Sequence, residues 1–427
     1  MSKAGSARSK SSWQGLFRGI EHLRRSVPWW HIAAGLVGAM LALALRYVLL
    51  DFKSVDYYAA LKPWYLTLRS EGFSAFGTDF SNYNPPYLYL LYLVVRFLPN
   101  VPMVVAVKLP AVVADFVCAL FAFLLVRLKY SNRSVVPLLA AGAILFAPTI
   151  VLNSSFWGQA DSLLALGMVG AVYFLARGHA GWAMFFYGIA LAFKLQGVFL
   201  APVIVALALR KLIPWKTLLI IPVVLLVALV PAWIAGRPFT HLVGIYASQA
   251  SQFEYITMNA FTAYTWLPGS KQVFNLFLPP GILMGGVAAL GLCYIVYRSD
   301  TKMAMPLMVE ASLLAVIVVP FFLPKMHDRY FYPADVLSIV LAFLSPGLFW
   351  VPIVMVGSSF ASYQPFLFER DLLPLPVLTL VILLLIVLLG RDTLRQLFSS
   401  QLPADSDEPQ GTSGPGGPAM GQAGVPR

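Results

Sequence analysis

The first acidic side chains that can do chemistry follow directly after the first long apolar run of the chain. Asp56 lies in Val55-Asp56-Tyr57-Tyr58, at the start of a stretch rich in aromatic residues, and Asp51 stands at the end of the apolar run itself. An aromatic surface can cover a carbohydrate ring and leave a carboxylate free to act as a general base. The alternative is a solvated loop acid, because carboxylates are mostly exposed. Asp51 competes with Asp56 for the catalytic role.

A further acid and a lysine interrupt apolar segments later in the chain. Asp161 ends the motif at 157–161, which includes Gln159, where an outer turn leads back into an apolar run. A carboxylate at a helix N terminus gains about 0.3–1 kcal/mol from the helix dipole, so capping is as good an interpretation as a cavity shared with Asp56. Lys194 interrupts the run 182–209, where an ammonium at mid-span costs about 2.5–3.5 kcal/mol. We therefore expect a helix break near Lys194, with its ammonium facing a cavity that suits an anionic phosphate.

The densest group of ionisable residues lies between two apolar runs at 324–333. Lys325, His327, Asp328 and Arg329 follow one another closely, and Tyr330 comes next. Lysine and arginine here can neutralise a phosphate leaving group, arginine through a bidentate fork. The alternative is a solvated turn with aromatic anchors. The histidine is weak evidence for a metal because no second histidine lies at ligand spacing.

The amino-acid composition indicates the class of protein whose elements position these residues. Apolar types make up 59% of the 427 residues and charged types 11%, and the mean hydropathy is +0.78. About a quarter of an ordinary soluble domain is charged, so a water-soluble globule is excluded. The net charge of +12 reports membrane topology rather than a nucleic-acid partner. Nucleotide-binding glycine motifs are missing, so nucleotide hydrolysis is not expected as the source of power.

The apolar residues form runs of the length that spanning helices need, about 20 residues each. We therefore predict an all-α, polytopic integral membrane protein with about 12 transmembrane helices. The runs are 30–50, 104–127, 135–152, 161–177, 182–194, 197–209, 217–235, 276–297, 304–323, 331–344, 347–362 and 372–389. Asp115, Glu310 and Asp335 fall inside or at the edge of these runs, where an acid more often faces a polar partner than lipid.

The basic residues predict which side each loop occupies. If the short apolar segment 87–98 is a juxtamembrane helix rather than a span, nearly all basic loops fall on the side of the N terminus, as the positive-inside rule requires. We expect cytoplasmic termini, an outer loop at 51–103 that carries the juxtamembrane helix, and a functional site on the outer face. Three parts follow: a basic interfacial helix at 1–29, a transmembrane domain at 30–395 and a disordered cytoplasmic tail at 396–427.

Six short motifs in this order resemble a known family. They are Val55-Asp56-Tyr57, Asn82-Tyr83-Asn84-Pro85-Pro86-Tyr87, Trp157-Gly158-Gln159-Ala160-Asp161-Ser162, Phe193-Lys194-Leu195-Gln196, Thr257-Met258-Asn259-Ala260-Phe261 and Met326-His327-Asp328-Arg329-Tyr330. Together they resemble bacterial membrane glycosyltransferases of the GT-C superfamily that are similar to GPI mannosyltransferase II. The resemblance extends over about residues 30–390.

The resemblance implies a transfer of a hexose, mannose being one candidate, from a polyprenyl-phosphate carrier to a glycan or lipid acceptor at the outer face of a bacterial plasma membrane. It implies that Asp56 is the catalytic acidic residue of the first outer loop and that donor phosphate contacts Lys194, Arg329 and His327. The expected cavity-lining or substrate-contacting residues are Asp51, Tyr57, Asn84, Gln159, Asp161, Asn259, Asp328 and Tyr330. Many relatives carry paired acids in the first loop, whereas Asp51 and Asp56 are five residues apart, so we favour no metal and no other cofactor over a divalent ion.

Two other functions fit parts of the sequence. Many transporters and lipid-linked sugar flippases also have about twelve spans with charges inside the membrane, although this chain shows no internal repeat. A polymerase or ligase that uses diphosphate-linked donors is chemically close and differs in the donor. The sequence leaves the sugar, the acceptor and the linkage open.

Overall fold

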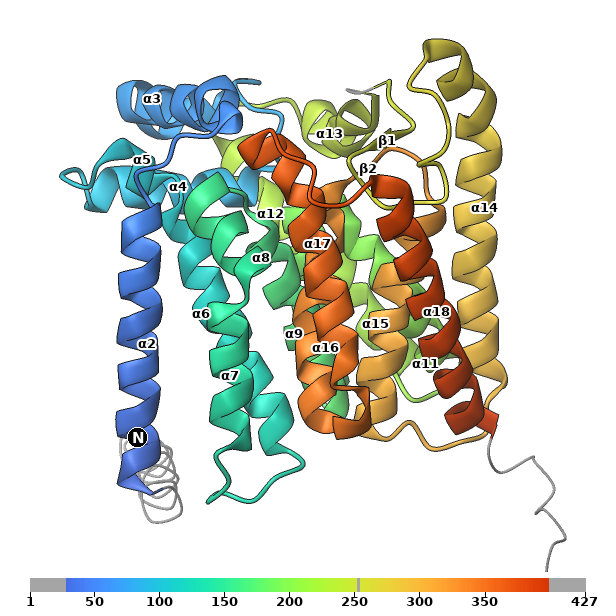
Figure 1. Cartoon of the computed structure of the whole chain (residues 1–427). Coiled ribbons are helices and arrows are strands. Elements are labelled where there is room, and N and C mark those ends of the chain that lie inside the picture. Colours follow the sequence, from blue (N-terminus) through green and yellow to red (C-terminus); the bar gives the residue numbers. More distant parts are fainter. Residues whose placement is uncertain (1–27, 252–253, 399–427) are drawn as a thin grey trace, which may run out of the picture.

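The computed structural model describes residues 28–251 and 254–398 of the chain. Within these residues the chain is almost entirely helical, and the predicted all-α polytopic fold is confirmed (Figure 1). The main elements are α2 (Trp29–Leu49), α3 (Lys62–Glu71), α4 (Pro85–Phe97), α5 (Met103–Ala106), α6 (Leu109–Arg127), α7 (Val136–Phe146), α8 (Pro148–Val151), α9 (Asp161–Ala176), α10 (Ala180–Phe193), α11 (Ala201–Leu209), α12 (Ile220–Ile234), α13 (Phe239–Ser251), β1 (Thr257–Met258), α14 (Lys271–Arg298), α15 (Met305–Phe322), β2 (Met326–His327), α16 (Tyr332–Leu344), α17 (Trp350–Phe368) and α18 (Leu375–Phe398).

Every apolar run expected from the sequence is mainly helical in the structure. Seven helices of the described part are long and apolar enough to cross a membrane, and an eighth crossing results if the bent pair α7 and α8 is one span. The pair bends by 49° because Pro148 starts α8 and Ala147 before it has extended backbone, as a residue before proline prefers. Three shorter apolar helices lie at 161–176, 180–193 and 195–209. The number of twelve crossings stays a prediction.

The ends of the bundle differ in charge. The start of α2 and the loop between α6 and α7 lie at the lower end in Figure 1, whereas α3, α13 and both strands lie at the upper end. Arg127, Arg298 and Arg395 occupy the last turns of α6, α14 and α18, and these three helices end at the lower end. This distribution is the one that the positive-inside rule gives when the lower end faces the cytoplasm.

The predicted outer loop lies at the upper end and is itself helical. The segment expected to form the juxtamembrane helix is helical, as α4, and Pro85 occupies its first turn, where the missing amide hydrogen of proline does no harm. Helix α3 was not expected from the sequence. It forms after a π-helical segment, η1 (Tyr57–Leu61), and buries Trp64, Tyr65 and Leu68 at helical spacing. A search for apolar runs does not find α3, because several of its residues are polar.

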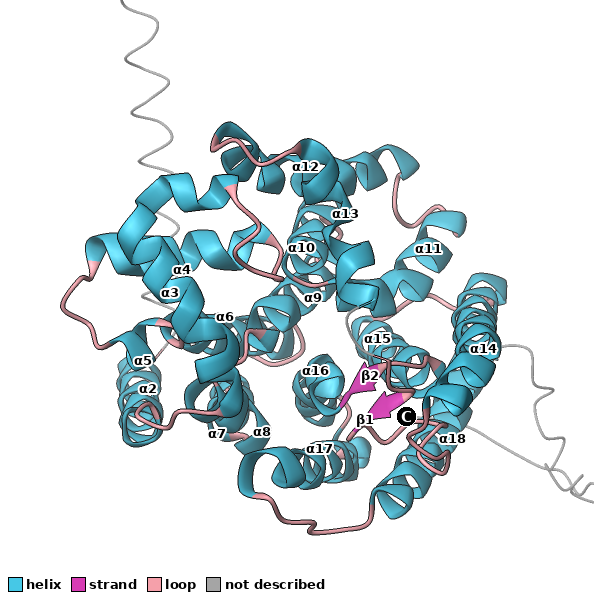
Figure 2. Cartoon of the chain, turned by 90° about the horizontal axis from the view of Figure 1, so that it is seen from above, coloured by secondary structure: helices cyan, strands magenta, loops and turns pink. Residues whose placement is uncertain are grey.

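The centre of the bundle is formed by α9, α15 and α16, which the other helices surround (Figure 2). Helix α9 packs closely on α10 because Gly167 leaves room for the backbone of Ala190; a Cβ atom at 167 would lie 2.6 Å from the Ala190 nitrogen. Most of α16 is buried. This packing holds the upper ends of α9, α10 and α16 in fixed positions relative to one another.

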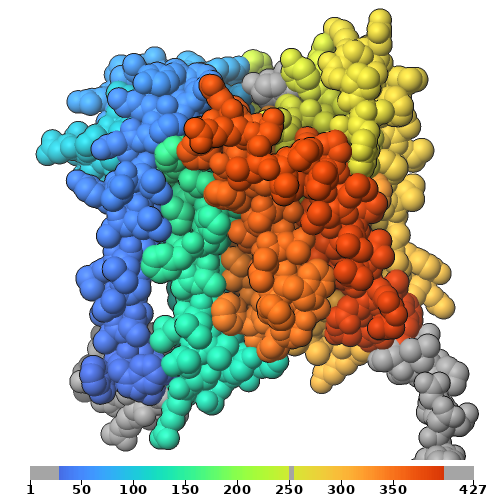
Figure 3. Space-filling model, in the orientation of Figure 1, coloured from blue at the N-terminus to red at the C-terminus, as the bar shows by residue number. Residues whose placement is uncertain are grey.

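Helix α2 stands at the edge of the bundle, and the space-filling view shows an opening between it and α7 (Figure 3). One buried ion pair attaches it: an Arg46 nitrogen lies 2.9 Å from the Asp115 carboxylate of α6. Tyr332 also donates a hydrogen bond to Asp115, at 3.0 Å. A buried charge needs such partners.

The other two intramembrane acids also have polar partners. Glu310 accepts hydrogen bonds from Thr393 and Gln396 of α18, at 2.8 and 2.7 Å. Asp335 accepts one from Ser359 of α17, at 2.8 Å. The expectation that these acids face polar groups rather than lipid is confirmed.

The predicted terminal parts lie mostly outside the described residues. The basic helix at 1–29 falls there except for its last two residues, and Trp29 already belongs to α2. Helix α18 continues to Phe398, three residues beyond the expected end of the transmembrane domain. The rest of the predicted tail, from 399 onward, is also outside the described residues.

Candidate active site

A polar cavity of about 450 Å³ opens among the elements at the upper end of the bundle. Segments far apart in the sequence form its wall: the start of the outer loop, the turn before α9, the break after α10, helix α13 and the segment after α15. The lining residues are Asp56, Ala59, Ala60, Leu61, Trp64, Asn82, Tyr83, Gln159, Phe193, Lys194, Gln196, Gln249, His327, Arg329 and Tyr330. The volume is within the usual range for a small-molecule site.

The carboxylate of Asp56 is held at the wall of this cavity. Asp56 immediately precedes η1. Its Oδ2 atom accepts a hydrogen bond from the indole nitrogen of Trp157 at 2.7 Å and one from the amide of Gln159 at 2.6 Å. Tyr83 in turn donates its hydroxyl to the side-chain oxygen of Gln159, at 3.2 Å. The candidate base is therefore part of a hydrogen-bond network and is not a freely solvated loop acid.

The turn that carries Trp157 and Gln159 depends on the glycine between them. Gly158 has a φ of +88°, which lies in the left-handed region that favours glycine. Its amide and that of Gln159 both donate to the backbone oxygen of Asn153, at 3.1 and 2.8 Å. A side chain at 158 would also come within 3.1 Å of Leu61. The residue types of this motif thus follow from the geometry of the turn.

Two cations and one buried carboxylate form another part of the site. The Lys194 ammonium lies 2.5 Å from Oδ1 of Asp161, and the Arg329 side chain approaches Oδ2 at 3.9 Å. Asn153 donates to the same Oδ2 atom at 2.9 Å. Lys194 is 11% exposed, Arg329 17% and Asp161 1%, so the cations reach the cavity wall and the acid lies behind them. One positive charge is left over to attract an anion.

The break predicted near Lys194 is present. Helix α10 ends at Phe193, Lys194 has extended backbone, and a 3-10 segment, η4 (Leu195–Leu200), follows. The break turns the lysine side chain towards Asp161 at the start of α9. Asp161 is the first residue of α9 but accepts from side chains across the turn, so it does more than cap its own helix.

The cluster after α15 contributes three lining residues. His327 belongs to β2, which pairs in parallel with β1, and Arg329 and Tyr330 belong to a 3-10 segment, η6 (Asp328–Phe331). Burial, together with the charges of Arg329 and Lys194, lowers the pKa of His327 to about 2. The imidazole is thus neutral at physiological pH.

Asp328 lies behind this wall. It is 3% exposed, and its Oδ1 atom accepts a hydrogen bond from the backbone nitrogen of Arg329 at 2.7 Å. Burial raises its pKa to about 7, although the neighbouring guanidinium of Arg329 acts in the opposite direction. Asp328 therefore changes its charge near neutral pH.

Besides Asp161 and Asp328, which lie behind the wall, four further residues expected at the site do not line the cavity. Asp51 is exposed and lies in the turn whose backbone oxygens bind the ammonium of Lys108 at 2.7 and 2.8 Å. Tyr57 is 5% exposed and packs in an apolar cluster under the outer loop. Asn84 is buried and donates to Tyr246 at 2.9 Å. Asn259 is exposed and forms a backbone bridge with His327.

The sequence interpretation missed several lining residues. Tyr83, which lines the cavity and donates to Gln159, stood inside a quoted motif without a role. The same holds for Trp157, which does not line the cavity but donates to Asp56. The amide side chains of Asn82, Gln196 and Gln249 also line the cavity. Amides and aromatic rings beside charged residues are the signal that would have found them. In the described part of the chain no group of three or more His, Cys, Asp or Glu side chains is arranged to hold a metal ion, and metal independence stays a prediction.

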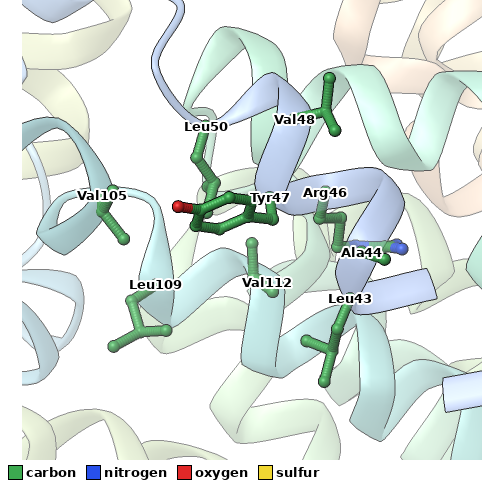
Figure 4. Close-up of a pocket in the computed structure, with 9 residues that line it drawn as sticks. All are labelled: Leu43, Ala44, Arg46, Tyr47, Val48, Leu50, Val105, Leu109 and Val112. Carbon is green, nitrogen blue, oxygen red and sulfur yellow. The ribbon is translucent and has the colours of Figure 1, made fainter. Parts of the chain in front are cut away.

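A second hollow, of about 530 Å³, lies between α2 and the segment α5–α6 (Figure 4). Its wall is almost wholly apolar, from residues such as Leu43, Leu109 and Val112. The one guanidinium there belongs to Arg46 and is paired with Asp115. This hollow suits a lipid environment and lacks groups for the transfer of a charged or polar molecule.

The fold and the cavity define the class of protein. The structure is similar to the crystal structure of ArnT from Cupriavidus metallidurans in the apo state, with a TM-score of 0.50 and 16% sequence identity over 84% of this chain and 77% of that one. No curated protein matches the chain in sequence. The chain thus shares the fold of ArnT.

The family follows from the sequence itself. Glycosyltransferase family 87 matches residues 82–320, more than half of the chain. The protein belongs to glycosyltransferase family 87. The matched segment includes Gln159, Asp161 and Lys194, whereas Asp56 and Arg329 lie outside it on either side. In the structure Asp56 and Arg329 line a single cavity together with Gln159 and Lys194.

Proposed function

We propose that the protein transfers a hexose from a polyprenyl-phosphate carrier to a hydroxyl group of a glycan or lipid acceptor, with inversion at the anomeric carbon. One observation carries the proposal: Asp56, Lys194 and Arg329, which are far apart in sequence, line the same cavity. Membership of glycosyltransferase family 87 supports sugar transfer as the reaction class. The choice of mannose rests on the resemblance of the motifs to mannosyltransferases alone.

The charges of the cavity suggest the role of each group. The acceptor oxygen attacks the anomeric carbon and forms the new glycosidic bond, while the bond from that carbon to the phosphate oxygen breaks. Asp56 takes the proton of the acceptor hydroxyl. The polyprenyl phosphate leaves with the bonding electrons, and Lys194 and Arg329 stabilise its negative charge.

Asp161 keeps the two cations in place in this mechanism. Because it contacts both Lys194 and Arg329, it holds their side chains on one side of the cavity. It also offsets one of their two charges, which limits how tightly the product phosphate is held. The neutral imidazole of His327 lies on the same wall and can donate or accept a hydrogen bond with a sugar hydroxyl or the phosphate.

The test is sugar transfer in reconstituted vesicles with radiolabelled polyprenyl-phosphate mannose and, in parallel, polyprenyl-phosphate glucose. Asp56→Asn keeps the side-chain shape but removes the base, and we expect kcat to fall by about 10²–10⁴, the usual contribution of a general base. Asp51→Asn is the matched control, because Asp51 lies outside the cavity and its loss should leave kcat within about twofold of the parent. Turnover of Asp56→Asn at the parental rate would remove Asp56 from the mechanism.

The same assay separates the other functions. A protein that moves lipid-linked sugar across vesicles without forming a glycosidic bond is a flippase or transporter. A protein that accepts only diphosphate-linked donors is a polymerase or ligase. We propose that the site faces outward in a bacterial plasma membrane, with cytoplasmic termini, so intact spheroplasts should glycosylate an added membrane-impermeant acceptor and sealed inside-out vesicles should not.

A further inference from the structure

The two hydrogen bonds to Asp56 end on the same oxygen atom. Trp157 and Gln159 both donate to Oδ2, at 2.7 and 2.6 Å. No other described side chain or backbone amide donates to the Oδ1 atom of Asp56. Two side chains therefore hold one oxygen of the carboxylate, whereas the described residues supply no donor to the other oxygen of this cavity-lining residue.

The two donors come from one rigid turn. Trp157 is 1% exposed and packs against Tyr363 and Phe366 of α17, with ring centroids 5.4 and 4.7 Å apart. The backbone oxygen of Trp157 accepts a hydrogen bond from Ser54 at 2.8 Å, two residues before Asp56. The turn and the outer loop are thus joined both by the Ser54 hydroxyl and by the Asp56 carboxylate.

Trp157 also touches the cationic side of the site. The guanidinium of Arg329 lies over its ring, 5.5 Å from the ring centroid. A cation above an aromatic ring is attracted to the face of the ring. The same indole therefore contacts the candidate base through its nitrogen and a phosphate-binding cation through its face.

We propose that Trp157 and Gln159 are positioning residues that bind Oδ2 of Asp56 and leave Oδ1 as the atom that takes the acceptor proton. This inference rests on the proposed function, because it assigns an orientation to its base. A carboxylate that rotates freely spends part of its time with neither oxygen towards the acceptor, so fixed orientation contributes to the rate of the chemical step. Substrate binding does not depend on this orientation. Loss of either donor should therefore lower kcat and leave KM unchanged.

Gln159 allows the more informative test, because the carboxyl group of the variant Gln159→Glu changes from neutral to charged as the pH rises. In Gln159→Glu the ionised side chain cannot donate and repels Asp56, whereas the neutral carboxylic acid can donate a hydrogen bond again. The charged groups that face this position across the cavity are Asp56, Lys194 and Arg329, with Tyr83 in direct contact. The cations and the neutral His327 keep their charge between pH 5.5 and 8. Asp328, behind Arg329, has a pKa of about 7 and does change its charge in this range, so each variant is compared with the parent at the same pH.

The experiment measures kcat and KM for sugar transfer at several pH values. For Gln159→Glu we expect a loss of about 100-fold in kcat at pH 8, with at least tenfold recovery relative to the parent at pH 5.5 and an unchanged acceptor KM. Gln159→Leu should lose about tenfold at every pH, without recovery. Trp157→Phe keeps a ring under Arg329 but lacks the donor and should also lose about tenfold in kcat.

Two exposed positions supply the controls. Gln272→Glu and Trp215→Phe change exposed side chains of α14 and of the segment before α12 and should behave as the parent does. If Gln159→Glu and Gln159→Leu show the same pH dependence, or if the losses lie in KM, the side chain only supports packing and the inference fails. The comparison of the two Gln159 variants is decisive even if Trp157→Phe does not fold. A parent protein that transfers no sugar contradicts the proposed function, whereas an active parent with unaffected variants contradicts this inference alone.

Discussion

Two buried carboxylates stand behind the cations of the cavity, and they differ in their contacts. Asp161 touches Lys194 and the Arg329 side chain, whereas Asp328 accepts only from the backbone nitrogen of Arg329 among the described residues. Burial raises the pKa of Asp328 to about 7. It is therefore neutral below pH 7 and becomes an anion beside Arg329 as the pH rises.

This titration predicts a pH-dependent donor affinity. A negative charge beside Arg329 weakens the attraction for the donor phosphate, so the donor KM should rise by about three- to fivefold between pH 6 and pH 8. A sugar phosphodiester has no group that titrates in this range, and the pKa of His327, at about 2, keeps the imidazole neutral.

The matching variant is Asp328→Asn, which cannot ionise. Its donor KM should stay flat from pH 6 to pH 8, near the value that the parent shows at pH 6. Initial rates at a fixed saturating acceptor concentration measure this. A variant with the same pH slope as the parent would show that another group is responsible.

Among single residues, the sequence predicted which motifs meet but not which side chain of each motif faces the cavity. In the motif that begins at Asn82, Asn82 and Tyr83 line the cavity while Asn84 is buried behind it. Neighbouring residues in a loop point in different directions, and no periodicity reveals which direction is inward. The sequence likewise did not show which of Asp51 and Asp56 faces the cavity, and only the packing of the outer loop distinguishes them.

Among the elements, the pair α9 and α10 positions the charged part of the site. Asp161 begins α9 and Lys194 follows the end of α10, so the distance between the helices sets their ion pair. Gly167 lies at a close contact between the two helices, with atoms of Ala190 within 2.8 Å of an added Cβ. Such a contact has no room for a side chain.

Gly167→Val should therefore separate the two helices. Overpacking of this kind destabilises by about 1–3 kcal/mol, and we expect a lower melting temperature in detergent together with at least tenfold lower transfer activity. Gly142→Val is the control, since an added Cβ at 142 in α7 meets nothing within 4 Å. Equal melting temperatures and activities of the two variants would contradict this role of Gly167.

The elements that the sequence predicted well are those with long apolar runs. The break at Lys194 was also predicted, because a charge in a stretch too long for one span needs an exit from the bilayer. Helix α3 was missed because it has only 10 residues and because charged residues stand at both ends of its buried stripe of Trp64, Tyr65 and Leu68. Its burial depends on tertiary contacts with α4 rather than on its own hydropathy.

For the whole molecule, composition and charge were sufficient to predict the class of architecture. The scarcity of charge excluded a soluble globule, and the basic residues of the helix ends gather at the end of the bundle away from the cavity. Composition and charge do not give the number of membrane crossings. Bent helices such as α7–α8 and short ones such as α10 show that the length of an apolar run does not by itself decide whether it crosses the membrane.

The proposed reaction requires one cavity that holds the sugar between Asp56 on one side and Lys194 and Arg329 on the other. The most direct measurement is an electron cryomicroscopy structure of the Asp56→Asn variant in lipid nanodiscs with bound polyprenyl-phosphate sugar. The substitution slows turnover, so the donor stays intact during the measurement. We expect phosphate density about 2.7–2.9 Å from the nitrogens of Lys194 and Arg329, with the sugar directed towards position 56. Phosphate density at the basic end of the bundle, or in the apolar hollow between α2 and α6, would contradict this arrangement.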